Sequence, residues 1–308
     1  MIMEILSCKT DVKKVPCVGT IGFFDGVHRG HLCLLDQVKH LASFKGLSSA
    51  VVTFPVHPRK VLHASYQPEL LSTKEEKLTL LSKAGIDRCI LLPFTEELSL
   101  YSAQAFMKML KEDYQIDVLV IGYDHRFGHD RTDQFEDYCR YGKALGMEVV
   151  QAREYEGESH SVSSSAIRQL LKQGEVEEAN RYLGYAYGLS GIVVNGHHIG
   201  RKIGFPTANL KTDEGKLLPK DGVYGVFVYL GGVKYKGMLN IGNRPTLENG
   251  ADKSVEVHIL DFEGDIYEKE LTVELQHYVR PEKKYRDISE LIEQMRKDRD
   301  QISHILVL

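Results

Sequence analysis

The chain has 308 residues, of which 43% are hydrophobic and 27% charged, and its formal net charge is -4 at pH 7. A chain of this length usually forms more than one hydrophobic core, so we expect two domains. The acidic balance argues against nucleic acid as a partner, and no apolar run reaches the roughly 20 residues that span a membrane.

The first half of the sequence alternates short apolar runs with helical segments. The runs are continuous rather than alternating, as in parallel strands that are covered on both faces. They are residues 15–21, 50–54, 89–92, 117–121 and 148–150. The helical segments between them include residues 32–42, 74–84, 103–113 and 134–145. This order predicts a doubly wound α/β fold with a parallel sheet, whose ligands bind beyond the carboxyl ends of the strands.

The pattern changes near residue 183, after two helical segments at residues 163–173 and 175–183. Short strands separated by glycine turns follow, at residues 190–194, 222–230, 233–240, 255–262 and 270–278. Residues 224–236 are typical of a hairpin about Gly231 and Gly232, and a helix is expected over residues 287–299. We therefore predict an α/β domain over residues 1–183. A mainly β domain, a small antiparallel barrel or sandwich with a terminal helix, is expected over residues 184–308.

A glycine-rich segment, Gly-Phe-Phe-Asp-Gly-Val-His-Arg-Gly-His over residues 22–31, joins the first strand to the first helix. Its glycines let the backbone turn sharply, and the helix start offers unpaired N–H groups to an anion. His28 and His31 add donors that can carry positive charge. The segment is a predicted phosphate-binding loop, with contacts expected from Gly22, Phe23, Asp25, Gly26 and Gly30. The alternatives are a turn with incidental histidines and a metal site completed by Asp25.

This loop resembles the His-x-Gly-His signature of the nucleotidylyltransferase superfamily, and its longer form is similar to that of the flavin adenylyltransferases. A second signature of that family matches residues 163–168, Ser-Ser-Ser-Ala-Ile-Arg. The hydroxyls of Ser163, Ser164 and Ser165 can cap N–H groups or contact phosphate oxygens, and Arg168 can clamp a phosphate. Taken alone, this segment could equally be an ordinary serine cap followed by a surface arginine.

Two further loops follow predicted strands at the same sheet edge. Residues 53–58, Thr-Phe-Pro-Val-His-Pro, resemble the family element T-F-x-P-H-P, which implies that His57 contacts phosphate or substrate. Residues 122–128 resemble G-x-D-F-x-F-G, although His125 replaces a phenylalanine and the glycines that normally follow are absent. The resemblance implies flavin contacts from Phe54, Asp124, Arg126 and Phe127.

The second half carries a compact motif, Gly-Phe-Pro-Thr-Ala-Asn over residues 204–209. The Thr207 hydroxyl and the Asn209 carboxamide are oxygen donors suited to magnesium and phosphate, although a polar turn between strands has the same composition. Upstream, Gly200 and Arg201 could form a flap over nucleotide phosphates. Further on, residues 255–259 place Glu256 on the polar face of a strand, as a solvated side chain or as a general base.

Four sequence blocks around that strand resemble the riboflavin kinase module over residues 185–308. They are residues 206–209, 218–224, 240–246 and 280–285. This resemblance implies a six-stranded barrel, a magnesium site at Thr207 and Asn209, and a catalytic base at Glu256. It also implies flavin contacts from Asn240 and Arg280.

Joined, the two halves resemble the prokaryotic bifunctional riboflavin kinase/FMN adenylyltransferase (FAD synthetase) family. The resemblance implies that riboflavin and ATP give FMN in the second domain, and that FMN and ATP give FAD and pyrophosphate in the first, with Mg2+ as cofactor. Nucleic acid and membrane are not expected as partners. The cysteines, which lack metal-ligand spacing, and the absence of an evident signal peptide predict a cytoplasmic location.

Three other functions stay open at this point. The first is a monofunctional riboflavin kinase whose adenylyltransferase domain is weakened around His125. The second is an adenylyltransferase that acts on a different phosphorylated alcohol. The third is a flavin-sensing or RNA-binding regulator without enzymatic activity, against which the acidic charge and the presence of Thr207, Asn209 and Glu256 argue.

Overall fold

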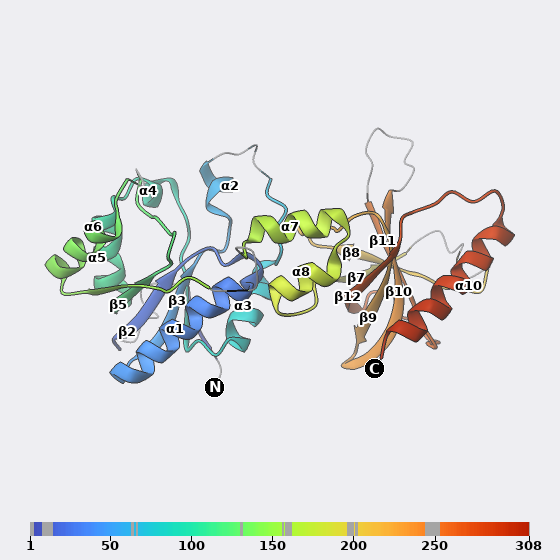
Figure 1. Cartoon of the computed structure of the whole chain (residues 1–308), viewed down its shortest axis with the longest axis horizontal. Coiled ribbons are helices and arrows are strands. Elements are labelled where there is room, and N and C mark those ends of the chain that lie inside the picture. The colour runs from blue at the N-terminus through green and yellow to red at the C-terminus, as the bar shows by residue number, and fades with distance from the viewer. Residues whose placement is uncertain are drawn as a thin grey trace. The chain divides into compact units, whose positions relative to one another are not determined.

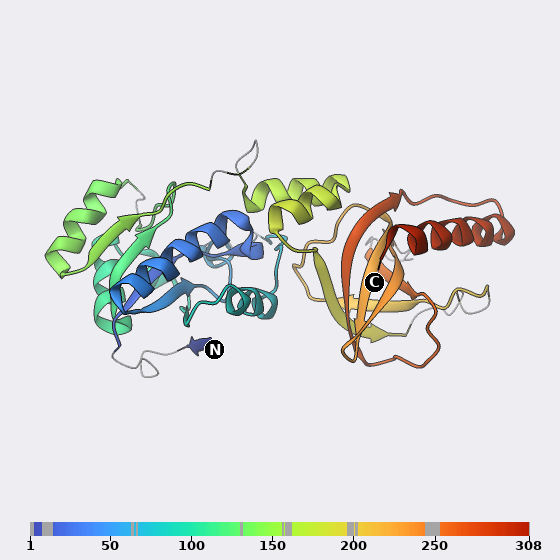
Figure 2. The same cartoon turned by 60° about the horizontal axis from the view of Figure 1, so that its bottom comes forward.

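Figures 1 and 2 show a computed structural model of the protein, which describes residues 3–7, 15–62, 65, 67–129, 132–155, 157, 162–195, 200, 203–243 and 253–307. The chain divides into two compact units, residues 1–164 and 165–308. The expected division at residue 183/184 differs because two helices, α7 (Ser164–Gln173) and α8 (Val176–Leu183), are grouped with the second unit.

The first unit is built on a six-stranded sheet with the strand order β1-β4-β3-β2-β5-β6. All neighbouring strands are parallel, which confirms the predicted doubly wound architecture. The strands are β1 (Glu4–Leu6), β2 (Cys17–Ile21), β3 (Ser48–Thr53), β4 (Arg88–Leu91), β5 (Ile116–Ile121) and β6 (Glu148–Gln151). Every residue of β2 is buried, as the continuous apolar run predicts.

Helices cover both faces of this sheet. They are α1 (Arg29–Lys45), α3 (Lys74–Lys83), α5 (Ala103–Tyr114) and α6 (Phe135–Leu145), with the short helices η2 (Asp25–Val27), α2 (Pro58–Leu62) and α4 (Glu96–Ser99) in the connections. On one face Leu35 of α1 and Leu81 of α3 pack against Val51. On the other face Met107 of α5 and Tyr138 of α6 pack in a core with strand residues such as Leu119.

The second unit is a closed antiparallel barrel with the strand order β10-β11-β8-β7-β12-β9 (Figure 2). Its strands are β7 (Gly188–Val194), β8 (Ala208–Thr212), β9 (Gly222–Leu230), β10 (Val233–Asn243), β11 (Lys253–Ile259) and β12 (Glu270–Arg280). The expected hairpin is present, because Leu230 of β9 pairs with Val233 of β10. The terminal helix α10 (Ile288–Ile305) packs through Ile302 on Phe227 and Met238.

An asparagine of helix α8, Asn180, is hydrogen-bonded to the barrel unit. The Asn180 side chain donates from Nδ2 to the Leu275 carbonyl at 2.8 Å and accepts from the Tyr187 N–H at 2.7 Å. In α7, the Leu171 carbonyl accepts from the Lys220 N–H at 3.0 Å. These bonds explain why both helices are grouped with the barrel, although the sequence order βαβα continues through them.

Candidate functional site

The loop after β2 has the predicted strand–turn–helix form. Phe24 and Val27 have φ values of 55° and 36°, a region that side chains other than glycine rarely adopt and that is common at ligand sites. His28 is the N-cap of α1, where its Nδ1 accepts a hydrogen bond from the His31 N–H at 3.3 Å. The two imidazole rings stack with their centroids 3.6 Å apart. Both histidines are therefore held rigidly at the helix start.

His31 differs electrostatically from its expected role. Its Nδ1 is buried and has no hydrogen-bond partner in the structure. Burial, with smaller effects from the charges of His28, His125 and Lys77, holds the pKa of His31 well below its usual 6.5. Burial thus favours the neutral ring, a hydrogen-bond donor or acceptor, over the charged form that the sequence allows.

The Asp25 carboxylate is bound by the segment that precedes α3. Asp25 is 4% exposed, and its carboxylate accepts hydrogen bonds from the backbone N–H groups of Leu71 and Ser72 at 3.0 and 3.1 Å. Among the residues that the structure describes, no three His, Cys, Asp or Glu side chains come together as a metal site. The alternative in which Asp25 completes a histidine metal site therefore has no structural support, and Asp25 positions the loop instead.

The second predicted signature reaches the same loop. Ser164 donates its hydroxyl to the Asp25 carbonyl at 2.9 Å. A side chain at Gly30 would lie 3.2 Å from the His28 ring and 3.4 Å from the Val162 carbonyl, so only glycine fits this close approach easily. Ser163 and Ser165 are exposed, and Arg168 is half-buried in the first turns of α7.

A lysine that the sequence did not single out joins the loops after β2 and β3. The Lys77 ammonium donates to the Phe54 carbonyl at 2.8 Å and to the Phe23 carbonyl at 3.1 Å. The His57 ring packs edge-on against Phe23 with the centroids 4.6 Å apart. The structure thus brings His57 to the loop that carries His28, as the shared sheet edge predicts.

The aromatic residues expected to face the flavin are mostly internal. Phe127 is 8% exposed and stacks on Tyr138 with the ring centroids 4.5 Å apart, and Phe54 is likewise 8% exposed. The Tyr138 hydroxyl donates to the Phe127 carbonyl at 3.2 Å. In contrast, Asp124 and Arg126 are exposed, and Arg126 donates to the Gln134 side chain at 3.1 Å. The loop thus offers polar groups outward and is anchored by its aromatic rings.

In the barrel, four predicted site residues lie in one lateral row of strand pairs. Asn209 of β8 pairs with Glu256 of β11, which pairs with Asn240 of β10. The row continues through Val223 of β9 to Arg280 of β12. Residues that pair across antiparallel strands project on the same face of the sheet. Because Val223 packs in the cluster with α10, this row is on the outer face of the barrel.

Thr207 lies two residues before Asn209, just before β8 begins. Its Oγ1 lies 3.5 Å from Glu256 Oε2, at the limit of a hydrogen bond. His258, two residues after Glu256, is buried and has its Nδ1 2.8 Å from the Pro206 carbonyl. Burial lowers the pKa of His258 below 6.5. The imidazole is therefore a support for the turn that carries Thr207.

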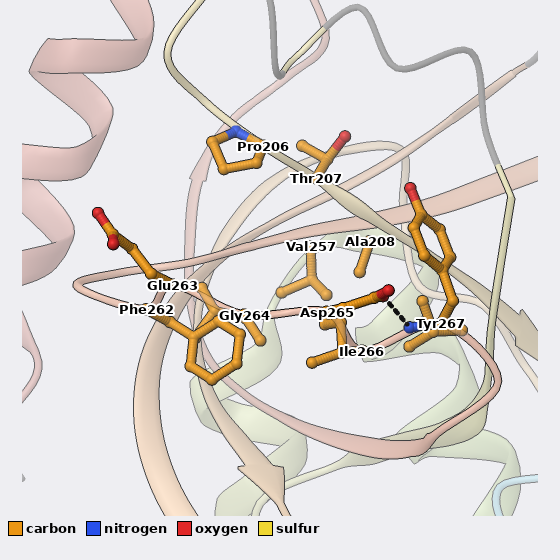
Figure 3. A pocket seen from close by; sticks show the side chains of 12 residues that line it. Pro206, Thr207, Ala208, Val257, Phe262, Glu263, Gly264, Asp265, Ile266 and Tyr267 are labelled. Carbon is orange, nitrogen blue, oxygen red and sulfur yellow. Dashed lines mark hydrogen bonds between the residues drawn. The ribbon is translucent and has the colours of Figure 1, made fainter.

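A cavity of about 260 Å³ opens beside Thr207 and was not foreseen from the sequence (Figure 3). Its walls include apolar side chains of β11 and a segment over residues 262–267. Figure 3 shows Pro206 and Thr207 on one side of Val257, with Phe262 and Tyr267 on the others. A Cβ at Gly200 would collide with the Phe205 carbonyl and lie 3.3 Å from Thr207 Oγ1, so only glycine fits this close approach. The predicted contact Arg201 lies outside the described residues.

Comparison with known proteins identifies the family of the chain that carries these two sites. A family model described as FAD synthetase matches residues 11–166, and one described as riboflavin kinase matches residues 183–306. A bifunctional riboflavin kinase/FMN adenylyltransferase from Listeria monocytogenes is 38% identical over 290 residues, which covers 94% of this chain and 91% of that protein. The chain belongs to the bifunctional riboflavin kinase/FMN adenylyltransferase family.

Other members of this family are similarly close. The proteins of that name from Bacillus subtilis (strain 168) and Escherichia coli (strain K12) are both 34% identical, each over 92% of this chain and 90% of the relative. A solved structure described as a macrolide-efflux protein from Streptococcus pneumoniae is 30% identical and covers 100% of both chains with a TM-score of 0.90. Both units of the bifunctional family are therefore present along the chain.

The oxygen donors in the barrel of this family member suit a magnesium ion. The Thr207 hydroxyl and the Asn209 carboxamide are hard ligands two residues apart at the start of β8, and Glu256 pairs with Asn209 from β11. Asn209 is 6% exposed, so its side chain is held in place rather than mobile in solvent. The donor set fits the ion that the family resemblance implies.

Arg280, a predicted flavin contact of the bifunctional family, is held by a buried ion pair. Its guanidinium donates to both Asp298 carboxylate oxygens at 2.7–3.1 Å, and Gln294 donates to the same carboxylate at 2.8 Å. The Asp298 side chain is 2% exposed and that of Arg280 is 20% exposed. The terminal helix α10 therefore orients the arginine on β12.

We expect Asp298→Ala to lower the free energy of unfolding of the barrel unit by roughly 3–5 kcal/mol, because it leaves a charge without its buried partner. Chemical denaturation measures the loss. Glu293→Ala is the matched control, since Glu293 pairs with Lys297 on the same helix with both side chains about two-thirds exposed. That variant should lose less than about 1 kcal/mol. Equal losses in the two variants would contradict the role given to Asp298.

Across the described residues, none of the helices has the length and apolar character needed to cross a membrane.

Proposed function

We propose that the barrel unit transfers the γ-phosphoryl group of ATP to the primary ribityl hydroxyl of riboflavin, and that the sheet unit transfers the adenylyl group of ATP to the resulting FMN. One observation carries this proposal above all. A single chain combines a parallel sheet with a histidine-capped helix start and a barrel with Asn209, Glu256 and Asn240 in one row. The matches to both family models support the same assignment.

In the phosphorylation step, Glu256 is the proposed general base. Its half-buried carboxylate takes the proton from the ribityl hydroxyl, whose oxygen forms a bond to the γ-phosphorus as the bond to ADP breaks. Thr207 and Asn209 would hold magnesium, which when bound neutralises charge on the phosphates. Asn240 and Arg280 flank the base and are the proposed flavin contacts. Most of the acceleration comes from alignment of the two reactants.

The cavity beside Thr207 is the proposed site for the adenine ring in this step. Its apolar wall residues Val193, Val257 and Ile259 suit a purine base, and Thr207, which also lines it, is the proposed magnesium ligand next to the phosphates. Gly200, where an added Cβ would lie 3.3 Å from Thr207 Oγ1, is a proposed nucleotide contact next to this threonine. Residues 262–267, which follow β11, close the other side of the cavity.

We expect Ile266→Trp, which fills this cavity, to raise the KM for ATP in riboflavin phosphorylation by about 10-fold, or about 1.4 kcal/mol. Steady-state kinetics with saturating riboflavin measures the change. Ile192→Trp is the matched control, because Ile192 is an exposed isoleucine on β7 that does not line the cavity. An unchanged KM in the Ile266 variant would move the adenine site elsewhere.

In the adenylylation step, the loop after β2 holds the phosphates of ATP. A phosphate oxygen of FMN attacks the α-phosphorus, and pyrophosphate leaves without a covalent enzyme intermediate. His28, His31, the N–H groups at the start of α1 and Arg168 are the proposed groups that orient the phosphates and stabilise the charge that develops. The outward polar groups Asp124 and Arg126 are the proposed contacts to the flavin nucleotide.

Product analysis tests the two reactions together. The protein is incubated with riboflavin, ATP and magnesium, and the products are identified by mass spectrometry. FMN followed by FAD is the expected result. FMN without FAD would favour a monofunctional kinase, adenylylation of another phosphorylated alcohol would change the acceptor, and flavin binding without ATP turnover would favour a sensor.

We also propose a cytoplasmic location, supported by free thiols at Cys17, Cys33, Cys89 and Cys139.

A further inference from the structure

Lys77 is a buried charged residue that the proposed reactions have not used. Lys77 is 2% exposed, although lysine is rarely buried unless it is paired. The ammonium donates to the carbonyls of Phe54 and Phe23 at 2.8 and 3.1 Å and lies 4.0 Å from the centroid of the Phe23 ring. These contacts satisfy a charge that burial would otherwise make costly.

The two carbonyls belong to the two loops that carry the predicted phosphate contacts. Phe23 lies in the loop that ends at His28, and Phe54 begins the loop that contains His57. The Thr53 hydroxyl also donates to the Phe23 carbonyl, at 3.1 Å. With the Thr53 hydroxyl, the ammonium is therefore a side-chain group that links the loop after β2 to the end of β3, and of the two it is the one that also bonds to Phe54 in the loop after β3. A small displacement of either loop would misalign groups that must contact one nucleotide.

We propose that Lys77 is a positioning residue of the adenylyl-transfer site, which fixes the loops after β2 and β3 and places a positive charge near His31. This inference rests on the proposed adenylylation of FMN. Lys77 does not itself contact the reacting atoms. It acts through Phe23 and Phe54, and through the electrostatic environment of His31.

The charge of Lys77 changes in an accessible pH range. Burial lowers the pKa of Lys77 from 10.5 to about 8, and the nearby groups Asp25 and Cys89 partly oppose this shift. Burial also raises the pKa of Cys89 to about 11, so the thiol stays neutral through the range in which Lys77 titrates. His31, the other titratable neighbour, has its pKa well below 6.5 and is neutral there as well. Lys77 is thus the group in this cluster that titrates near pH 8.

Stability and activity should respond to this titration in opposite directions. Between about pH 8 and 10.5 the unfolded chain binds more protons at Lys77 than the folded chain, so this group's contribution to stability rises with pH. Over the same range the folded protein loses the ammonium that joins the loops, so adenylylation should fall. A residue that only supported the fold would not lower activity while stability rises.

The test compares wild type, Lys77→Met and Lys77→Arg in the full chain, with FMN and ATP as substrates for FAD formation. We expect Lys77→Met to slow FAD formation at pH 7 by roughly 10–100-fold, the scale of a misplaced site, while riboflavin phosphorylation stays within about twofold. Wild-type FAD formation should decline above about pH 8, and Lys77→Arg should lose that decline because its guanidinium stays charged. The pKa of His31, followed by NMR, should rise in Lys77→Met.

Lys39→Met is the matched control. Lys39 of α1 also donates to a backbone carbonyl in this unit, that of Ala84 at 2.7 Å, but it is half-exposed and pairs with Asp36 on its own helix. This variant should keep the wild-type rate and pH profile. A wild type that makes no FAD from FMN would defeat the proposed function itself.

A wild type that makes FAD, with Lys77→Met equally fast at every pH, would overturn only the role of Lys77. If Lys77→Met shows no cooperative unfolding transition, and so is not properly folded, the pH profiles of wild type and Lys77→Arg test the proposal instead. The same alkaline decline in both would overturn the proposal.

Discussion

Replacing Glu256 with alanine is expected to slow riboflavin phosphorylation by about 10²–10⁴-fold, the usual scale for a positioned general base. Glu256 Oε2 lies 3.5 Å from Thr207 Oγ1, and Asn209 and Asn240 flank it on the neighbouring strands. The substitution leaves those neighbours in place and removes the carboxylate that accepts the proton of the ribityl hydroxyl. Single-turnover formation of FMN from riboflavin and ATP measures the loss in the chemical step.

Two further carboxylate variants sharpen this result. Glu256→Gln keeps the shape of the side chain and should be nearly as slow as the alanine variant, because an amide cannot accept the proton in the same way. Glu274→Gln is the control, since Glu274 lies on β12 of the same barrel and accepts a hydrogen bond from Tyr229 at 2.9 Å. It should phosphorylate riboflavin normally. Adenylylation of added FMN should be unchanged in all three variants, and near-normal phosphorylation by Glu256→Ala would remove Glu256 from its role.

The main architecture could be predicted because buried parallel strands have a simple signature. The core strands β2, β3 and β5 are continuous apolar runs, and turn signals or helical segments separate them. Strand β1 (Glu4–Leu6) was not predicted, because three residues carry too little pattern. Strand β8 (Ala208–Thr212) was not predicted either, since Asn209 and Lys211 interrupt its apolar residues and its start lies inside a functional motif.

The sequence predicted where the candidate site residues lie better than it predicted the charge of their side chains. Loop position at a sheet edge placed His57 near the phosphate loop, and period two placed Glu256 on the polar face of its strand. These are backbone properties, which sequence spacing reflects directly. The pairing of Glu256 with Asn209 is known only from the structure. The loss of charge on His31 depends on burial by the folded chain, and no local pattern contains that information.

Long-range partners could not be predicted for the same reason. Lys77 occupies an ordinary position in an amphipathic helix, and only the fold brings it to Phe23 and Phe54. Asp298 is likewise one of many charged residues in α10, and its pairing with Arg280 joins segments 18 residues apart. Each of them lies four residues before a buried apolar residue of its own helix, Leu81 or Ile302, so a charged residue on the apolar face of a helix is the signal to check once a structure is known.

The adenylyl-transfer site should depend most strongly on His31. We expect His31→Ala to reduce FAD formation from FMN and ATP by about 10²–10³-fold, the effect of losing a preorganised donor to the transition state. Riboflavin phosphorylation should continue, so FMN accumulates in place of FAD. His40→Ala is the matched control, because His40 is an exposed histidine on the same helix. Full FAD formation by His31→Ala would mean that the loop after β2 does not hold the reacting phosphates.

The same variant tests whether His31 works as a neutral ring. Burial holds the pKa of His31 well below 6.5 in the folded protein, whereas the unfolded chain takes up a proton there near pH 6.5. The unfolded state therefore gains protons that the folded state does not, and wild-type stability should fall as pH drops below about 6.5. His31→Ala should lose this part of the pH dependence when denaturation is compared at about pH 7 and about pH 5. Equal dependence in both proteins would show that the folded and unfolded states have the same pKa at His31, and would contradict the neutral ring at acidic pH that burial predicts.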